Sequence, residues 1–302
     1  MSIPGATSPA SRQAVPRGTG CLNPALSLPA MRISGSCYAD PGKMGFVEIA
    51  DYIEALREQG TQLADAAGRA GLDAAVPPCP PWLVKDLLRH TGYVHRWAAR
   101  HVNECPPRIL DGPAEDEILT GGAPDAELID WFRAGHAALV RALTAADPKL
   151  ECATLMPASS PLAFWARRQA HETAIHRADA ASASGVRSRF ASDFAADGVD
   201  ELIIGFGQRR KYRPSPGHDG TLRVRTTDTG DAWYLREEDG RIYAHRGPGE
   251  PAGPSDCVVS GPASGLYLFL WNRSGADEAG VKVSGDPAVL ASWQSSVQVR
   301  WD

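Results

Sequence analysis

The stretch that decides the fold is residues 168–179, which read RQAHETAIHRAD. It lies inside a helical pattern that starts near Pro161 and ends at the stop signal Gly185. Glu172 and His176 are four residues apart, so on a helix they lie about 40° apart around the axis and about 6 Å apart along it. Two side chains in this arrangement can hold one metal ion between them.

The same helix carries one stripe at i, i+3, i+4 spacing that begins apolar and becomes polar. Its members are Leu162, Trp165, Gln169, Glu172, His176 and Asp179. A polar group on a stripe that faces a core costs free energy unless it is paired or binds a metal. The pattern therefore favours a polar site inside the protein, with Asp179 placed to orient the His176 imidazole.

A second helical pattern, which opens at Pro80-Pro81-Trp82, shows the same anomaly. Its apolar stripe is interrupted by His90 and otherwise consists of Leu83, Leu87, Val94 and Trp97. If the two inward faces meet in a bundle, His90, Glu172 and His176 converge as two imidazoles and one carboxylate. This donor set suits Zn²⁺ or a similar divalent ion, and it leaves a fourth position open, as in catalytic sites.

The spacing also has a simpler interpretation. Glu-x-x-x-His pairs are common on helices, and most are solvated ion pairs or hydrogen-bonded core groups. Among the other histidines, we predict that His95 and His101 lie at the surface and that His171 faces solvent or a neighbouring helix. Cys79, just before the second helix, is interpreted as a structural thiol.

Periodicity outside these helices indicates an α+β multidomain fold. Further helical patterns over 49–67 and 128–143 complete a predicted antiparallel four-helix bundle within residues 44–188. Residues 189–302 are predicted to form a small α+β domain. Its expected elements are helices over 190–207, 265–271 and from 286 onward, and strands over 222–225, 233–235, 241–244, 257–260 and 281–283, with a hairpin turn at 238–240.

Composition excludes several classes of protein. The chain has 302 residues, 43 % of them hydrophobic, and a formal net charge of −5, which offers no basic surface to a nucleic acid. No uninterrupted apolar run reaches the roughly 18 residues of a membrane span, so no membrane partner is expected. The six cysteines are scattered without a CxxC pair, as in cytoplasmic proteins with free thiols. We therefore expect a cytoplasmic protein, either a monomer or a homodimer.

Residues 1–43 are rich in Ser, Pro, Gly and Ala and show no periodicity, so they are predicted to be a disordered extension. Deleting them should leave the unfolding temperature and the metal content nearly unchanged, because the segment lacks a core-forming pattern. Thermal unfolding and metal analysis of the shortened chain test this. A large loss of stability would show instead that the segment packs onto the fold.

Several segments resemble one known family. Residues 76–82, VPPCPPW, followed by DLLRH at 86–90, are similar to the metal-binding N-terminal domain of the mycothiol-dependent maleylpyruvate isomerase family, within the wider DinB-like superfamily. Residues 168–179 resemble that family's second signature. Residues 261–273 and 283–286 are similar to its small, sterol-carrier-like C-terminal domain.

The resemblance implies site residues and cofactors. The family's metal ligands match His90, Glu172 and His176, the same three residues that the inward stripes select, and an arginine from the C-terminal domain matches Arg273 as a catalytic residue. A divalent metal, with zinc expected, and mycothiol as thiol cosubstrate are implied. The expected partners are a small electrophile and this low-molecular-weight thiol.

The implied activity is an isomerase or S-transferase reaction in which a metal-bound thiolate adds to a small electrophile. The residues do not separate these two outcomes. Two alternatives remain: a DinB-like metal-dependent hydrolase that uses bound water, and a non-catalytic protein that binds small ligands and keeps a structural metal.

Overall fold

The structure is a computed structural model that describes residues 48–111, 115, 118, 122–209, 220–238, 240–247 and 254–297. All of these residues belong to one compact unit, Lys43–Asp302. The predicted extension over residues 1–43 lies outside the described residues. The predicted boundary between residues 188 and 189 stays a prediction.

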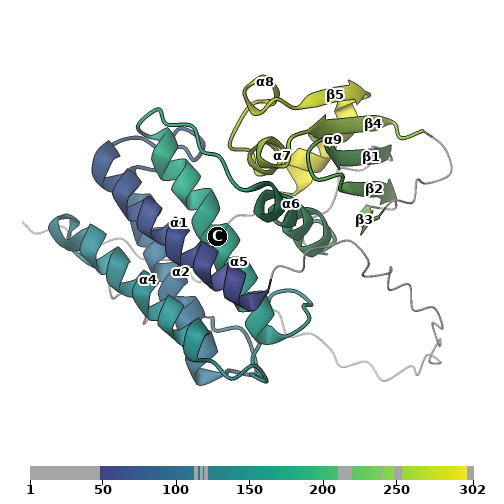
Figure 1. Cartoon of the computed structure of the whole chain (residues 1–302). Coiled ribbons are helices and arrows are strands. Elements are labelled where there is room, and N and C mark those ends of the chain that lie inside the picture. Colours follow the sequence, from purple (N-terminus) through teal and green to yellow (C-terminus); the bar gives the residue numbers. More distant parts are fainter. Residues whose placement is uncertain are drawn as a thin grey trace, which may run out of the picture. The chain divides into compact units, whose positions relative to one another are not determined.

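Four long helices form the first part of this unit, as predicted (Figure 1). They are α1 (Ile49–Ala70), α2 (Val84–Glu104), α4 (Leu128–Ala145) and α5 (Pro161–Ser182), with a short 3₁₀ turn, η1 (Asp125–Glu127), before α4. Helix α2 begins later than the sequence pattern predicts. Backbone hydrogen bonds from Val76 N to Trp82 O and from Val84 N to Ala74 O hold the preceding segment in a turned conformation.

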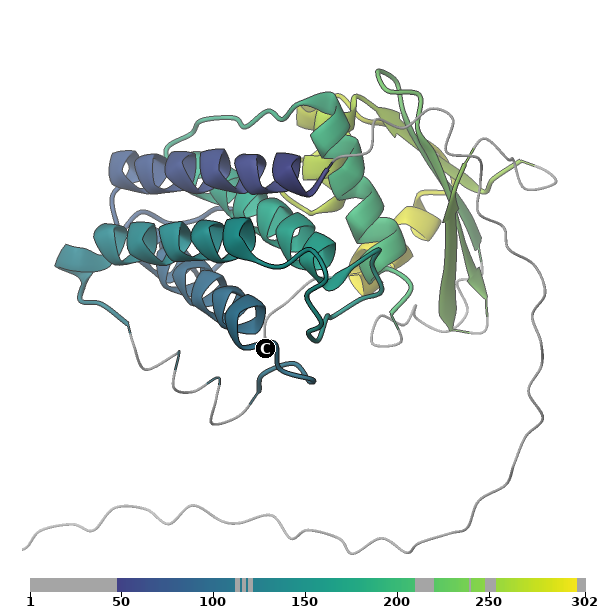
Figure 2. The same ribbon diagram turned by 60° about the horizontal axis from the view of Figure 1, so that its bottom comes forward.

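Each of the four helices packs mainly against two others, and the helices lie side by side in both views (Figures 1 and 2). Helix α5 runs antiparallel to α2, because His90 of α2 lies beside His176 of α5, whereas His101, further along α2, lies beside Trp165 near the start of α5. Helices α1 and α5 run in the same direction: Tyr52 lies beside His171, and Gln59 bonds Arg177.

The predicted antiparallel arrangement therefore holds for some neighbouring pairs and not for all of them. Helices α2 and α4 also run in the same direction, since Arg96 and Gly92 of α2 lie beside Gly135 and Trp131 of α4. Such a pair needs a long crossover, and the chain between Glu104 and Asp125 supplies it.

The prediction that His95 and His101 lie at the surface is wrong, because both side chains are fully buried. Helix α2 is covered by α4 on one side and by α5 on another, so residues beside its apolar stripe are also enclosed. His95 Nε2 lies 2.9 Å from Thr173 Oγ1. His101 Nε2 accepts a hydrogen bond from the backbone N–H of Leu110, whose segment closes that end of the bundle.

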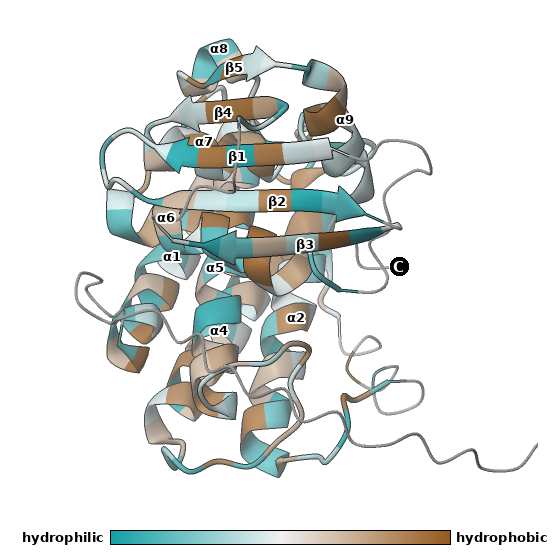
Figure 3. Cartoon of the chain, turned by 90° about the vertical axis from the view of Figure 1, so that its right-hand side faces the viewer, coloured by the Kyte–Doolittle hydropathy of each residue, from teal (hydrophilic) through white to brown (hydrophobic). Residues whose placement is uncertain are grey.

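The second part of the unit contains a five-stranded mixed sheet in the order β3-β2-β1-β4-β5, which Figure 3 shows in front of the helices. The strands are β1 (Gly220–Thr226), β2 (Ala232–Glu238), β3 (Arg241–Arg246), β4 (Cys257–Gly261) and β5 (Lys282–Gly285). Strands β1 and β4 are parallel, and the other neighbours are antiparallel. The predicted hairpin is confirmed by the antiparallel pairing of Glu238 with Arg241.

Helices of the second part pack against this sheet. Helix α9 (Pro287–Ser296) contacts β1 and β4, and α7 (Ala263–Leu270) contacts β4. The side chains of Leu222, Val224 and Val259 are buried in alternation along their strands, as a half-covered sheet requires. A one-turn helix that the sequence did not predict, α8 (Ala276–Ala279), precedes β5.

One predicted helix over 190–207 is observed as two joined segments. Helix α6 (Ser192–Asp200) continues into a π-helical turn, η2 (Glu201–Phe206). Such turns are rare and frequently mark functional sites, because the wider turn re-aims the side chains that it carries. Among the described residues, no helix is both long and apolar enough to cross a bilayer.

The contact between α1 and α4 leaves no room for a side chain at Gly60. A Cβ added there would lie 2.3 Å from the His136 ring, which hydrogen-bonds the Leu56 carbonyl at 3.0 Å. We expect Gly60→Ala to lower the free energy of unfolding by about 1–3 kcal/mol, as overpacking usually does. On the same helix, a Cβ added at Gly68 would make only an ordinary contact at 3.8 Å. Gly68→Ala should therefore raise the free energy of unfolding by up to about 1 kcal/mol. Urea unfolding of both variants tests this, and equal stabilities would contradict it.

Candidate metal centre

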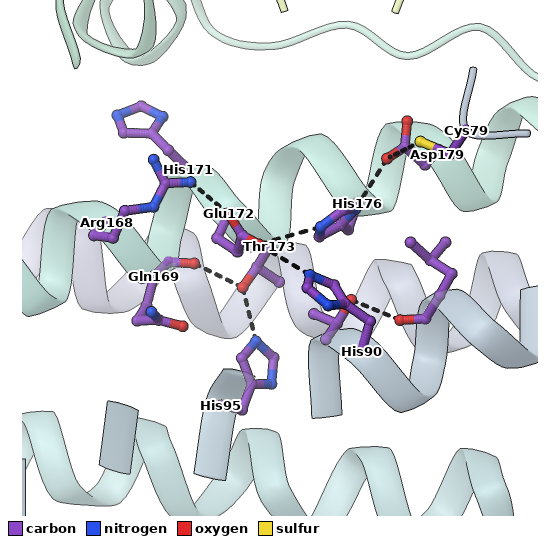
Figure 4. Close-up of polar contacts among 12 residues, drawn as sticks. Cys79, His90, His95, Arg168, Gln169, His171, Glu172, Thr173, His176 and Asp179 are labelled. Atoms are coloured by element: carbon purple, nitrogen blue, oxygen red, sulfur yellow. Dashed lines mark hydrogen bonds and ion pairs between the residues drawn. The ribbon is translucent and has the colours of Figure 1, made fainter. Parts of the chain in front are cut away.

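The structure brings the three predicted ligand residues together. His90 comes from α2, and Glu172 and His176 from α5. One ligand atom from each lies within 4.8 Å of the other two. Both imidazoles aim their Nε2 atoms at the same carboxylate oxygen: Glu172 Oε1 lies 3.4 Å from His90 and 3.2 Å from His176 (Figure 4). Glu172 and His176 are buried, and the His90 side chain is 12 % exposed.

The remaining polar atoms of Glu172 and His176 are held by protein partners. Arg168 Nη2 donates to Glu172 Oε2 at 2.7 Å, so Oε1 is left to face the two histidines. His176 Nδ1 donates to Asp179 Oδ2 at 2.9 Å, which turns Nε2 toward the centre of the cluster. This is the contact that the sequence predicted for Asp179, and metal-ligating histidines usually have such a carboxylate partner.

Electrostatics keep this cluster charged. Burial alone would raise the pKa of Glu172, but the Arg168 guanidinium and the two histidine contacts outweigh it and hold the pKa well below its usual range. Burial alone would lower the pKa of His176, but Asp179 and Glu172 raise it to about 9. For His90, burial outweighs the contact with Glu172 and lowers the pKa. The Glu172 carboxylate therefore stays ionised and attracts positive charge, and the His90 imidazole stays neutral.

These residues fit a divalent metal ion. Two imidazole nitrogens and one carboxylate oxygen converge within the space that one ion requires, and this donor set is typical of zinc. Glu172 and His176 each have a second atom fixed by a partner, as ligands of metal sites generally do. The metal ligands themselves stay a prediction.

The predicted catalytic residue, Arg273, lies close to this cluster but does not touch its three members. Its Nε and Nη2 donate to the two oxygens of Asp179 at 2.9 and 3.1 Å, and its Nη1 donates to Trp271 O. Burial alone would lower the pKa of Arg273, but the paired carboxylate raises it further above its ordinary value. The guanidinium of Arg273 and the imidazole of His176 thus both donate to the carboxylate of Asp179. Arg273 also lines a cavity of about 580 Å³.

Two neighbours of the cluster were not predicted as parts of a site. Trp82 packs over both imidazoles, with ring centroids 5.0 Å from His90 and 6.4 Å from His176. The Cys79 Sγ lies 3.6 Å from Asp179 Oδ2 and 3.5 Å from Arg273 Nη2, and burial together with Asp179 raises its pKa to about 12. Both residues precede α2 in the proline-rich motif VPPCPPW over 76–82, whose resemblance to the family's metal-binding domain was the signal for them in the sequence.

His171 has a different environment from the cluster, although it is adjacent to Glu172 in sequence. It projects away from His90 and His176 (Figure 4) and is fully buried. Its Nε2 lies 2.7 Å from Asp197 Oδ2 of α6, and its Nδ1 lies 3.1 Å from Tyr267 Oη of α7. It therefore joins α5 to the second part of the unit, in agreement with the prediction that it faces a neighbouring helix.

Fold and site together define a class of protein: a four-helix region with an inward His-Glu-His cluster, followed by a small mixed-sheet region. Protein-family models match both parts. The model described as "Mycothiol maleylpyruvate isomerase N-terminal domain" matches residues 53–181, and the "MDMPI C-terminal domain" matches residues 193–292. The chain belongs to the mycothiol-dependent maleylpyruvate isomerase family.

Solved structures show the same fold. The crystal structure of the mycothiol-dependent maleylpyruvate isomerase matches with a TM-score of 0.54 and 16 % identity, and it covers 78 % of this chain and 93 % of that one. A histidine-to-alanine mutant of that enzyme matches with a TM-score of 0.55 at the same identity and coverage. No curated protein matches the sequence.

Proposed function

We propose that this protein is a metal- and mycothiol-dependent isomerase or S-transferase that acts on a small electrophile. The observation that carries the proposal is the convergence of His90, Glu172 and His176 on one point, with Nε2 of both histidines facing the same carboxylate oxygen. Membership of the family supports the dependence on thiol, and the name of the matching enzyme suggests maleylpyruvate as the first substrate to try.

His90, Glu172 and His176 would hold the metal through two nitrogens and one oxygen. When bound, a divalent ion supplies positive charge that lowers the pKa of a coordinated thiol, so that the thiolate exists at neutral pH. With three protein ligands, a four-coordinate ion would have one position for an exogenous group. Trp82 covers the two imidazoles and limits the access of water from that side.

The isomerase reaction needs a thiol that adds to a cis double bond, rotation about the resulting single bond, and elimination that returns the thiol and the trans product. In the S-transferase reaction, the carbon–sulfur bond is kept. The protein's own task is to position the electrophile. We propose that Arg273 does so by contacting a carboxylate of the substrate, because it lines a cavity and is the arginine matched by the family.

The proposal is tested with purified protein in three steps. Metal analysis should find about one divalent ion per chain. Maleylpyruvate should be converted to its trans isomer only when mycothiol is present, and the amount of free thiol should stay constant. Stoichiometric consumption of mycothiol with an electrophile panel would assign the S-transferase reaction instead.

The same experiment separates the two alternatives. Turnover at full rate without any thiol would favour the hydrolase that uses bound water. A tightly held metal that accepts no exogenous thiol, together with no turnover on any electrophile, would favour the non-catalytic binding protein with a structural ion.

A further inference from the structure

We propose that Arg168 and Glu201 are positioning residues that fix how Glu172 presents its carboxylate at the metal centre. This inference rests on the proposed metal site and assigns a function to two residues that do not contact the three ligand atoms. Arg168 precedes Glu172 by one turn of α5, whereas Glu201 is the first residue of the π-helical turn η2, outside the four-helix region.

Arg168 connects two buried carboxylates. Its Nη2 donates to Glu172 Oε2 at 2.7 Å, and its Nη1 donates to Glu201 Oε2. The exposed fractions of the three residues are 1 %, 3 % and 2 %, so no solvent screens these contacts. The guanidinium fork therefore has a fixed orientation, with one carboxylate on each of its terminal nitrogens.

Aromatic rings hold the same guanidinium from other directions. Its central carbon lies 5.1 Å from the ring centroid of Phe206 in η2 and 5.4 Å from that of Trp271, which follows α7. Both rings belong to the second part of the unit. The position of Arg168, although it is a residue of α5, is thus set by residues that lie after residue 200.

The consequence for Glu172 concerns its two oxygens. Arg168 occupies Oε2, and Oε1 is the oxygen that faces His90 Nε2 and His176 Nε2. The carboxylate can therefore offer a single oxygen to an ion. Without Arg168, Oε2 loses this donor and can turn toward the same ion, because the contact that fixes the orientation of the carboxylate is gone.

A cobalt titration tests the role of Arg168 and Glu201. Metal-free wild-type protein and the variants Arg168→Lys and Glu201→Gln are titrated with Co²⁺ against a chromophoric chelator, and the visible spectrum of the bound ion is recorded. Lysine keeps the charge but cannot bond both carboxylates through a fork. Glutamine keeps the shape of Glu201 and removes its charge.

We expect Arg168→Lys to weaken Co²⁺ binding by roughly 10- to 100-fold, as the loss of outer partners of metal ligands does. Its absorption band should also weaken, because a second oxygen of Glu172 raises the coordination number. Glu201→Gln should cause a smaller change in the same direction, and it keeps the test valid if Arg168→Lys fails to fold.

Arg167→Lys is the matched control. Arg167 also joins α5 to α6, through Asp197 at 2.9 Å and Asp200 at 3.1 Å, but it touches no ligand of the cluster. It should lower stability in urea while leaving cobalt affinity and spectrum unchanged. Wild-type affinity and spectrum in both Arg168→Lys and Glu201→Gln would overturn the inference. A wild-type protein that takes up no cobalt would overturn the proposed metal site itself.

Discussion

Replacing His176 with alanine is expected to remove most of the bound metal and to abolish turnover. His176 contributes one of three converging ligand atoms, and its imidazole is fixed on both sides, by Glu172 at 3.2 Å and Asp179 at 2.9 Å. Loss of a direct ligand should cost more affinity than the roughly 10- to 100-fold that loss of an outer partner costs. Metal content after mild chelation and the rate of the thiol-dependent reaction measure the effect.

His171→Ala is the matched control on the same helix. His171 is equally buried, but its contacts are with Asp197 and Tyr267 and not with the cluster. We expect this variant to lose about 1–3 kcal/mol of unfolding free energy, because it removes two buried hydrogen bonds of the imidazole, and to keep its metal. Full metal content in His176→Ala, or equal metal loss in both variants, would show that the cluster is not the site.

The convergence of His90, Glu172 and His176 could be predicted from the sequence because the three residues obey helical geometry. Glu172 and His176 share one face of a single helix, and His90 replaces an aliphatic residue at an inward position of another. Polar residues at inward positions of two helices come together when those two helices are neighbours in the bundle. Helices α2 and α5 are neighbours, so the convergence required only that the four-helix fold be correct.

The burial of His95 and His101 could not be predicted by the same rule. A single apolar stripe describes a helix that is covered on one side, whereas α2 is covered by both α4 and α5. Helix α5 is the extreme case, with most of its side chains buried. Its polar residues, including Gln169 and Thr173, are as enclosed as its apolar ones. A helix that is covered on several sides has a weak amphipathic pattern, so its sequence does not indicate which residues are buried and which are exposed.

Two contacts with residues outside the bundle also escaped prediction, although the family resemblance matched Arg273 itself as a catalytic residue. Glu201 bonds Arg168 across 33 positions of sequence, and Arg273 reaches Asp179 across 94. Spacing along one helix carries no information about such contacts. Glu201 looks like an ordinary charged residue in the sequence until the fold brings it to Arg168, and a π-helical turn such as η2 has no clear sequence signature.

The second large effect is expected for Arg273. Replacement by leucine should lower catalytic efficiency by roughly one to two powers of ten, because a charge-assisted contact to a substrate carboxylate contributes about 1.5–3 kcal/mol. It should also lower stability. Asp179 is fully buried and would lose its only arginine partner among the described residues, and breaking a buried ion pair costs about 3–5 kcal/mol. Because Arg273 keeps some exposure, we expect the lower end of this range.

These two effects must be separated, since Asp179 also holds His176. A double-mutant cycle with Asp179→Asn does so, because asparagine needs no counter-ion and keeps a side chain of the same shape. In the Asp179→Asn background, Arg273→Leu should no longer cost much stability. If Arg273 contacts the substrate, the same substitution still lowers kcat/KM in that background, by roughly 10-fold or more, while metal affinity stays constant. If Arg273 acts only by holding Asp179, Arg273→Leu has no further effect on kcat/KM once Asp179 is replaced, and the assignment of Arg273 to the substrate is wrong.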